Sequence, residues 1–312
     1  MTSPDATVAP ARVFTASDVA AAVQLACLLE VSAPKPGNVS PGRHFVDLRY
    51  EDFLASAVAI GEPLGGAGSR PLGATIRLAI DATVRWTQSN TNVGIVLLLA
   101  PLAKAALRIN GVGNDLRPHL SDVLEATDVQ DARDVYAAIR KASPGGLGRA
   151  ESQDVTAEPT VSLLAAMRLA AHRDGVAREY ATAFETTFGV AAPALGQARR
   201  EGLAWDDAVV ETFLKILAHA PDTHIARRGG DGLARDVSSQ AKDVLAKGGV
   251  RSSAGRRAID QLDGALRQDS AAKANVGNPG TTADLTAAAI FIELLREGPR
   301  RQARGGDHAG SR

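Results

Sequence analysis

Cysteine is almost absent from this chain, which has one, Cys27, among 312 residues. A single thiol excludes a disulfide framework and a zinc site built from cysteines. Cys27 lies in an apolar helical pattern, so we expect a small buried side chain there and not a nucleophile. Aromatic residues make up only 4% of the chain, while alanine, leucine and glycine dominate, which is typical of closely packed helices.

Net charge and long apolar runs are missing as well. The 35 basic and 35 acidic residues balance, so the basic face of a nucleic-acid-binding protein is not expected. The longest apolar run, 93–103, is too short to span a bilayer. The polar first residues do not resemble a secretory signal. We therefore expect a cytoplasmic protein with no nucleic-acid or membrane partner, and the sequence is compatible with a homodimer.

What the sequence does contain is helical periodicity. Apolar residues recur every three to four positions, and no segment shows the sustained alternation of a half-buried strand. The pattern predicts an all-α fold, a single large domain of about twelve helices over residues 11–297, with disordered tails at 1–10 and 298–312. The expected helices are 17–30, 50–60, 72–88, 93–108, 129–141, 161–172, 178–188, 192–201, 205–219, 233–246, 253–267 and 281–296.

Polar junctions between these helices are the places where chemistry could be built. One of them, 278–284, is a Pro-Gly turn directly before a long apolar helix. Gly280, Thr281 and Thr282 would offer backbone N–H groups and hydroxyls to a phosphate, and Asp284 would act through a bound Mg²⁺. The segment is also close to a capping box, with Thr281 as N-cap and Asp284 three positions later. On the sequence alone we favour capping.

A second junction, 30–39, turns through two prolines around Lys35. Because prolines fix the backbone on both sides, the amine would be held with little loss of entropy, which suits a triphosphate. The alternative is a solvent-facing lysine in a rigid loop. Asp47 follows a further Pro-Gly turn, and it is either a site residue or a surface residue.

A third junction, 222–230, ends in two arginines and two glycines. Arg228 could grip phosphate oxygens while Gly229 and Gly230 let the backbone approach, and Asp222 could serve as metal ligand or base. The alternative is a helix with Asp222 near its start, the arginines near its end and Gly229 as its C-cap, which explains the charges equally well.

Two more junctions are open to interpretation. Asn90, Thr91 and Asn92 precede an apolar helix, which Asn90 or Asn92 could cap. The glycines of 145–148 form either a mobile lid or a plain connection. They do not match a phosphate-binding Walker loop or a dinucleotide fingerprint.

Taken in order, five segments resemble the triphosphoribosyl-dephospho-CoA synthase family over about residues 16–295. They are EVSAPKPGNV, DLRYEDFLASA, NTNVG, DTHIARRGG and NPGTTADLTAAAIF. The resemblance is closer to a shorter branch of that family. The sequence differs at Asn92–Val93, where the family has a His-Lys pair, and at Arg227–Arg228, where it often has His-Arg.

The resemblance implies an all-helical transferase that moves the triphosphoribosyl group of ATP to a hydroxyl of 3′-dephospho-CoA and releases adenine. Its product is the precursor of a prosthetic group of citrate lyase or malonate decarboxylase acyl carrier proteins. The family motifs mark Glu30, Lys35, Pro36, Gly37, Asp47, Phe53, Ser56, Asn90, Thr91, Gly94, Asp222, Thr223, Arg228, Gly229, Gly230, Gly280, Asp284 and Leu285.

Such a transfer passes through a positively charged, oxocarbenium-like sugar. We expect Asp222, Glu30 and Asp47 as catalytic carboxylates, and Asp284 and Asp47 as ligands of an Mg²⁺ that accompanies ATP. Phe53 and Asn90 would line an adenine pocket. The expected substrate-binding residues are Lys35, Gly37, Asn90, Thr91, Arg228, Gly229, Gly230, Gly280, Thr281 and Thr282.

Two alternatives stay open. The same carboxylates and Mg²⁺ would serve an N-glycosidic hydrolase of a nucleotide, with water as acceptor. A non-catalytic helical protein that binds a nucleotide or a partner would release no adenine with any acceptor. Within the leading hypothesis the acceptor could also be another hydroxyl-bearing cofactor precursor, such as a pterin with a ribityl side chain.

Overall fold

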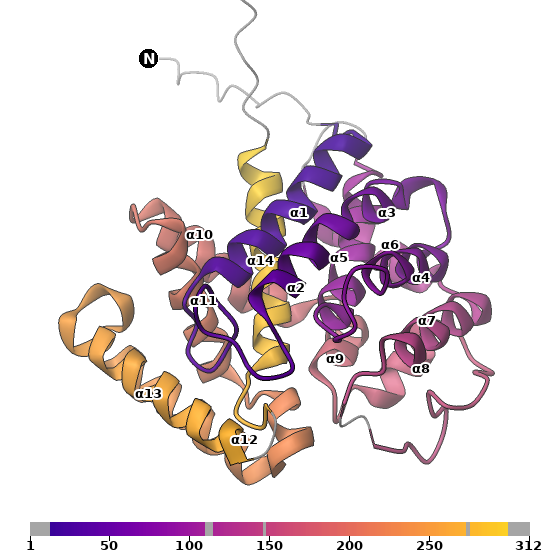
Figure 1. The fold of residues 1–312 in the computed structure, drawn as a ribbon. Coiled ribbons are helices and arrows are strands. Elements are labelled where there is room, and N and C mark those ends of the chain that lie inside the picture. The colour runs from indigo at the N-terminus through magenta and orange to yellow at the C-terminus, as the bar shows by residue number, and fades with distance from the viewer. Residues whose placement is uncertain (1–12, 110–114, 146–147, 273–274, 299–312) are drawn as a thin grey trace, which may run out of the picture.

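The structure is a computed structural model that describes residues 13–109, 115–145, 148–272 and 275–298. In these residues it contains fourteen α-helices, and its only extended pairing is two isolated bridges (Figure 1). The all-α prediction and the approximate number of helices are therefore confirmed. The predicted tails 1–10 and 298–312 lie outside the described residues, apart from Gly298.

The helices are joined by connections of varied length, the longest of which span residues 33–49 and 143–162. In chain order they are α1 (Ala16–Ser32), α2 (Tyr50–Ala59), α3 (Gly61–Gly65), α4 (Leu72–Thr83), α5 (Val93–Ala106), α6 (Leu116–Glu125), α7 (Val129–Ala142), α8 (Leu163–Ala170), α9 (Gly175–Ala181), α10 (Ala192–Arg200), α11 (Trp205–His219), α12 (Thr223–Ala246), α13 (Ser253–Ala272) and α14 (Gly280–Glu297). Helices α3 and α6 were not predicted from the sequence.

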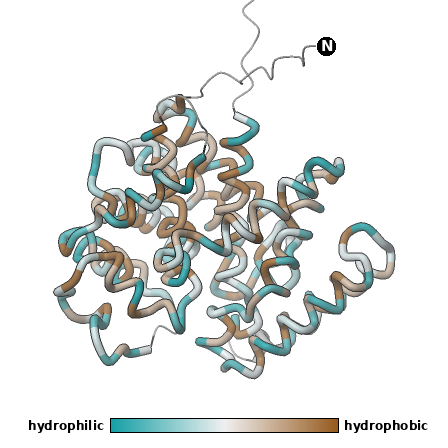
Figure 2. Tube along the Cα trace, turned by 180° about the vertical axis from the view of Figure 1, so that it is seen from behind, coloured by the Kyte–Doolittle hydropathy of each residue, from teal (hydrophilic) through white to brown (hydrophobic). Residues whose placement is uncertain are grey.

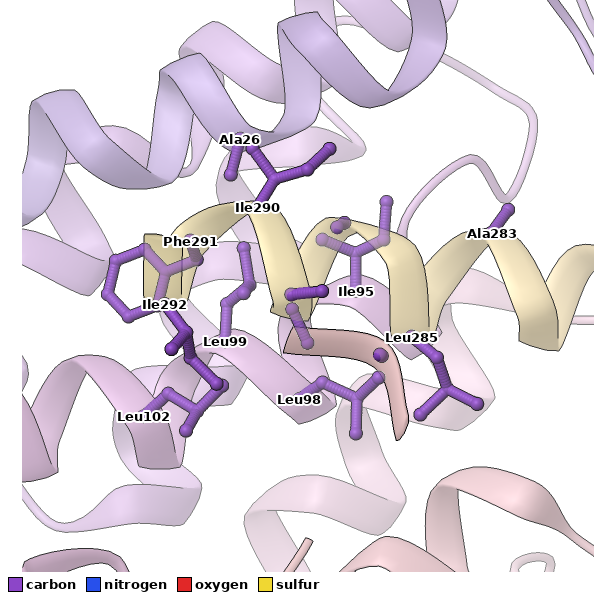
Figure 3. Close-up of a cluster of buried hydrophobic side chains, with 14 of the residues drawn as sticks. Ala26, Ile95, Leu98, Leu99, Leu102, Ala283, Leu285, Ile290, Phe291 and Ile292 are labelled. Atoms are coloured by element: carbon purple, nitrogen blue, oxygen red, sulfur yellow. The ribbon is translucent and has the colours of Figure 1, made fainter. Parts of the chain in front are cut away.

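Helix α14 forms the centre of the molecule. It packs against α1, α5, α10 and α11, and its residues from Leu285 to Glu293 are buried without interruption (Figure 1). Figure 3 shows Ile290 and Phe291 of α14 among side chains of α5 and α1, including Leu99 and Ala26. A helix that is apolar on every side is stable only when other elements surround it. None of the described helices is long and apolar enough to cross a membrane.

The remaining helices form two groups on either side of this centre. On one side α4 packs on α7 and α8 packs on α9, while on the other α11 packs on α12 and α12 on α13 (Figure 1). Hydrophilic and hydrophobic residues alternate along α13, the long helix at the lower right of Figure 2, as expected of a helix with one exposed face. The two groups come closest where α14 begins.

One predicted helix, 178–188, is wrong. Helix α9 ends at Ala181, and the chain then passes through Ala183 and Phe184 at positive φ (50° and 62°) before a π-helical segment. The buried carboxylate of Glu179 explains the break, because it accepts the backbone N–H groups of Thr186 and Thr187 at 3.0 and 2.8 Å. Those hydrogen bonds cap a new helical segment where a continuous helix was expected.

Candidate active site

A cavity of about 880 Å³ lies where the N-termini of α5, α9, α12 and α14 approach one another. Helices α7 and α8 give it an apolar wall that includes Ile139, Leu163 and Met167. Acidic, basic and histidine side chains gather elsewhere on its lining: Glu30, Asp47, Arg149, Glu151, Asp154, His172, Arg173, Asp174, His224, Arg227, Arg228 and Asp284. The cavity therefore combines an apolar surface with a charged one, as a nucleotide site requires.

Asp222 joins the start of α12 to the start of α14. One of its carboxylate oxygens accepts the N–H groups of His224 and Ile225 at 2.7 and 3.1 Å, which makes it the N-cap of α12. The other accepts the N–H and the hydroxyl of Thr282, both at 2.7 Å. Burial raises the pKa of Asp222, and these hydrogen bonds oppose the rise. The helix-start alternative from the sequence is confirmed, and the carboxylate is not part of the cavity lining.

The threonines at the helix starts bond to each other. The hydroxyls of Thr223 and Thr281 lie 3.0 Å apart, and Thr223 also accepts the N–H of Gly175 at 3.0 Å. A Cβ at Gly175 would lie 2.7 Å from Cγ2 of Thr281, so only glycine allows this approach. The capping box favoured from the sequence is wrong, because α14 starts behind Pro279 with no side-chain cap. Thr281 contacts another helix instead.

Asp284 lies against the first turn of α5. A Cβ at Gly94 would come within 2.0 Å of its Oδ2 atom, so the carboxylate occupies the space that a side chain would need. Burial, followed by the negative charges of Glu30 and Asp222, raises the pKa of Asp284 well above its ordinary value. Glu30 and Asp284 both line the cavity, which therefore contains two interacting acidic groups.

Glu30 is held by Lys35. Pro34 disfavours helical conformation at the residue before it, α1 ends at Ser32, and the chain turns back so that the ammonium lies 3.0 Å from Glu30 Oε1. The same ammonium donates to the carbonyls of Glu30 and Ala33 at the end of α1. Burial raises the pKa of Glu30 and lowers that of Lys35, while each partner's charge counters the shift. Lys35 thus contacts Glu30 inside the protein, and its predicted contact with triphosphate stays a prediction.

The first turns of α12 add two arginines and a histidine to the cavity lining. Arg227 pairs with Asp174, the N-cap of α9. Arg228 lies close to Gly145, since a Cβ placed on Gly145 would be 2.6 Å from Nη2 of Arg228. The sequence did not predict His224, whose Nε2 is buried without a hydrogen bond. Burial, together with both arginines, lowers the pKa of His224 to about 3, so the imidazole is neutral at pH 7.

The other predicted site residues have varied surroundings. The side-chain oxygen of Asn90 caps α5 by accepting the N–H of Val93 at 3.2 Å, and the Asp47 carboxylate accepts from Asn275 at 2.6 Å. Gly37 donates its N–H to Asp263 at 2.8 Å. The alternative that made Gly229 a C-cap is wrong, because α12 is interrupted at Gly230 (φ 89°) and continues to Ala246.

The lining of the cavity divides the predicted residues into two groups. Those that line it are Glu30, Asp47, Asn90, Thr91, Arg228, Gly280, Thr281 and Asp284. Those that do not are Lys35, Gly37, Asp222, Gly229, Gly230 and Thr282.

Comparison with known proteins gives the same assignment as the motifs. The family model described as "CitG: ATP:dephospho-CoA triphosphoribosyl transferase" matches residues 16–302. The chain belongs to the CitG family. The resemblance predicted from the five sequence segments is therefore confirmed.

Curated relatives match this CitG-family chain over part of their length. "Probable 2-(5''-triphosphoribosyl)-3'-dephosphocoenzyme-A synthase" of Pseudomonas syringae pv. tomato is 37% identical over 121 residues, 38% of this chain and 39% of that protein. The Klebsiella pneumoniae protein named as this synthase is 30% identical over 121 residues, 39% of this chain and 41% of its own length. The matches thus span about two fifths of these relatives.

A solved structure covers more of the CitG-family fold. A candidate triphosphoribosyl-dephospho-CoA synthase from Archaeoglobus fulgidus aligns with a TM-score of 0.61 and 26% identity. The alignment covers 79% of this chain and 100% of the archaeal one. The helical fold is thus shared with a shorter relative over most of this chain.

Asp284→Asn should stabilise the protein at neutral and alkaline pH. The folded state raises the pKa of Asp284, so the buried charge lowers stability above that pKa and has no effect well below the unfolded value of about 3.9. We expect the Tm of the variant to exceed that of the parent by about 2–4 °C at pH 8. The difference should shrink as the pH falls through the folded-state pKa.

The exposed Asp236, changed to Asn, is the control and should leave the Tm nearly unchanged at each pH. Thermal unfolding followed by circular dichroism measures both variants. An Asp284→Asn protein that is no more stable than the parent at pH 8 would contradict the buried charge.

Proposed function

We propose that this chain transfers the triphosphoribosyl group of ATP to a hydroxyl of 3′-dephospho-CoA and releases adenine. The family description and the names of the relatives support the reaction. The observation that carries the proposal is the cavity in which Glu30 and Asp284 lie beside the start of α14 and the arginines of α12. Such a cavity suits both a polyphosphate and a sugar that becomes positively charged.

The polyphosphate end is proposed at the start of α14. The helix is eighteen residues long, and Gly280 and Thr281 at its start line the cavity, so the positive end of its dipole would attract an anion there. The N–H of Gly280 itself donates to the Asn278 carbonyl at 2.8 Å. Arg228 adds a permanent positive charge on the same lining. Together they would neutralise part of the triphosphate and fix its position relative to the sugar.

A magnesium ion bound with ATP fits the acidic pair. Mg²⁺ prefers oxygen ligands and commonly takes one or two carboxylates together with substrate phosphates. Of this pair Asp284 would supply the ligand, and the cation would offset the negative charges of Glu30 and Asp222 that raise the pKa of Asp284. In the described part of the chain no three His, Cys, Asp or Glu side chains gather as a complete metal site, which agrees with an ion that arrives with its nucleotide. Bound there, Mg²⁺ would supply charge neutralisation at the phosphates.

Glu30 is the carboxylate that we propose to act on the sugar. Its Oε1 atom lies 3.0 Å from the Lys35 ammonium, which fixes the carboxylate from inside the protein, and Glu30 lines the cavity. It could therefore stabilise the oxocarbenium-like sugar or take the proton of the attacking hydroxyl. Asp222 would position the two helix starts, since both of its oxygens already accept hydrogen bonds from the chain. The cytoplasmic location and the homodimer remain predictions of the sequence.

Mass analysis of the products tests the reaction directly. Mixed with ATP, Mg²⁺ and dephospho-CoA, the protein should form free adenine and dephospho-CoA carrying an added triphosphoribosyl group in equal amounts. Asp284→Asn should reduce both products together. Adenine released equally well without dephospho-CoA would favour the hydrolase. No adenine, with or without dephospho-CoA, would favour a binding protein.

Gly94→Ala should lower turnover at least tenfold while the protein remains folded. The added methyl group would meet Asp284 Oδ2 at 2.0 Å and push the carboxylate out of place, although alanine is the better helix former by about 1 kcal/mol. Gly264→Ala in α13 is the matched control, because a Cβ there meets nothing within 4 Å. Steady-state rates of adenine release measure both variants. Full activity in Gly94→Ala would show that the close approach to Asp284 does not matter.

A further inference from the structure

A second, smaller cavity opens beside the first. It has a volume of about 260 Å³ and lies between the end of α4, the segment 87–92 and the end of α7. Residues 88–92 and Ala142 line both cavities, so one ligand can extend from the charged cavity into the smaller one. The smaller cavity therefore continues the proposed active site.

Asn92, which lines both cavities, carries a hydrogen-bond acceptor without a partner. The side chain is 5% exposed, and its Oδ1 atom is buried without a partner. The amide nitrogen donates to the Thr83 hydroxyl at 3.0 Å, and that hydroxyl donates its own proton to the Ala79 carbonyl at 3.1 Å. With the amide in this orientation Thr83 accepts from Asn92, and the Asn92 oxygen lacks a donor. A buried acceptor of this kind calls for a donor on a ligand.

The segment that holds Asn92 is fixed on several sides. The Ser89 hydroxyl donates to the Asp47 carbonyl at 2.7 Å, and the hydroxyls of Thr91 and Ser56 share a hydrogen bond. The side-chain oxygen of Asn90 accepts the N–H of Val93. The acceptor of Asn92 is thus held in place before any ligand arrives, which lowers the entropy lost on binding.

The lining favours a neutral, flat, polar-edged group. Among the described residues that line it, Lys141 carries the only formal charge, and it pairs with Asp81 at 2.5 Å. Ile80, Val84 and Ala142 offer apolar surface for the faces of a ring. Phosphate would find no unpaired cation here, whereas a purine base finds apolar contact and a partner for an exocyclic amine.

We propose that the small cavity is an adenine site in which the exocyclic amine donates to Asn92 Oδ1. The proposal rests on the proposed function, which brings two adenine rings to the protein, one in ATP and one in dephospho-CoA. The ring of either substrate has the required chemistry. In both cases Asn92 selects adenine over a purine without the amine.

Calorimetric binding without turnover tests this site. The wild-type protein is titrated with ATP and with purine riboside triphosphate, which lacks the exocyclic amine, and then with dephospho-CoA and its purine analogue. We expect about a tenfold preference for the amine-bearing member of one pair. Asn92→Ala should bring that preference close to one by weakening only the amine-bearing ligand. Thr83→Val, which keeps the volume but removes the partner that orients Asn92, should reduce the preference in part.

The outcomes show whether ATP or dephospho-CoA supplies the adenine ring. They also separate the adenine-site proposal from the proposed reaction. Loss of preference in the ATP pair assigns the cavity to the donor, and loss in the dephospho-CoA pair assigns it to the acceptor. A wild-type protein without preference in either pair, or an Asn92→Ala protein that keeps it or weakens both members equally, overturns the adenine site. A preserved preference in a wild-type protein that forms no triphosphoribosyl product would refute the reaction and leave the site standing.

Discussion

The site depends on one buried carboxylate, that of Asp222, which caps α12 and also binds the first turn of α14. By accepting four hydrogen bonds from residues of α12 and α14, it holds the starts of both helices together. Thr223 and Thr281 then meet, and Asp284, one turn further along α14, faces the first turn of α5. The charged half of the cavity follows from this junction, because no single helix could bring its groups together.

The same arrangement is costly for the fold. Glu30 and Asp284 are both buried acids, and the negative charge of Glu30 raises the pKa of Asp284, while Glu30 itself pairs with Lys35. Proteins keep such unfavourable charges where function requires them, since removing one stabilises the fold and impairs the site. A nucleotide with its cation would turn this repulsion into binding free energy.

Much of the fold could be predicted from the sequence, and less of the site. The continuous apolar pattern of α14 and α5 identified the core helices, and the residue type and place of Asp222 indicated its capping role. Which residues lie close together in space could not be predicted from the sequence in the same way. The pairing of Lys35 with Glu30 depends on the path of the chain after α1, and the break after α9 depends on the Glu179 side chain. His224 and Asn92 drew no prediction of a site role, because only burial shows that their polar atoms lack partners.

The central claim is that the buried acids near Gly94 receive the cation and phosphates of a nucleotide. Calorimetry of Mg-ATP binding in two buffers of different ionisation enthalpy, at a mildly acidic pH, tests it most directly. Because the pKa of Asp284 is raised, binding should release protons, and Asp284→Asn should abolish most of that release. Binding heats that are independent of the buffer, or a release unchanged in Asp284→Asn, would contradict the claim.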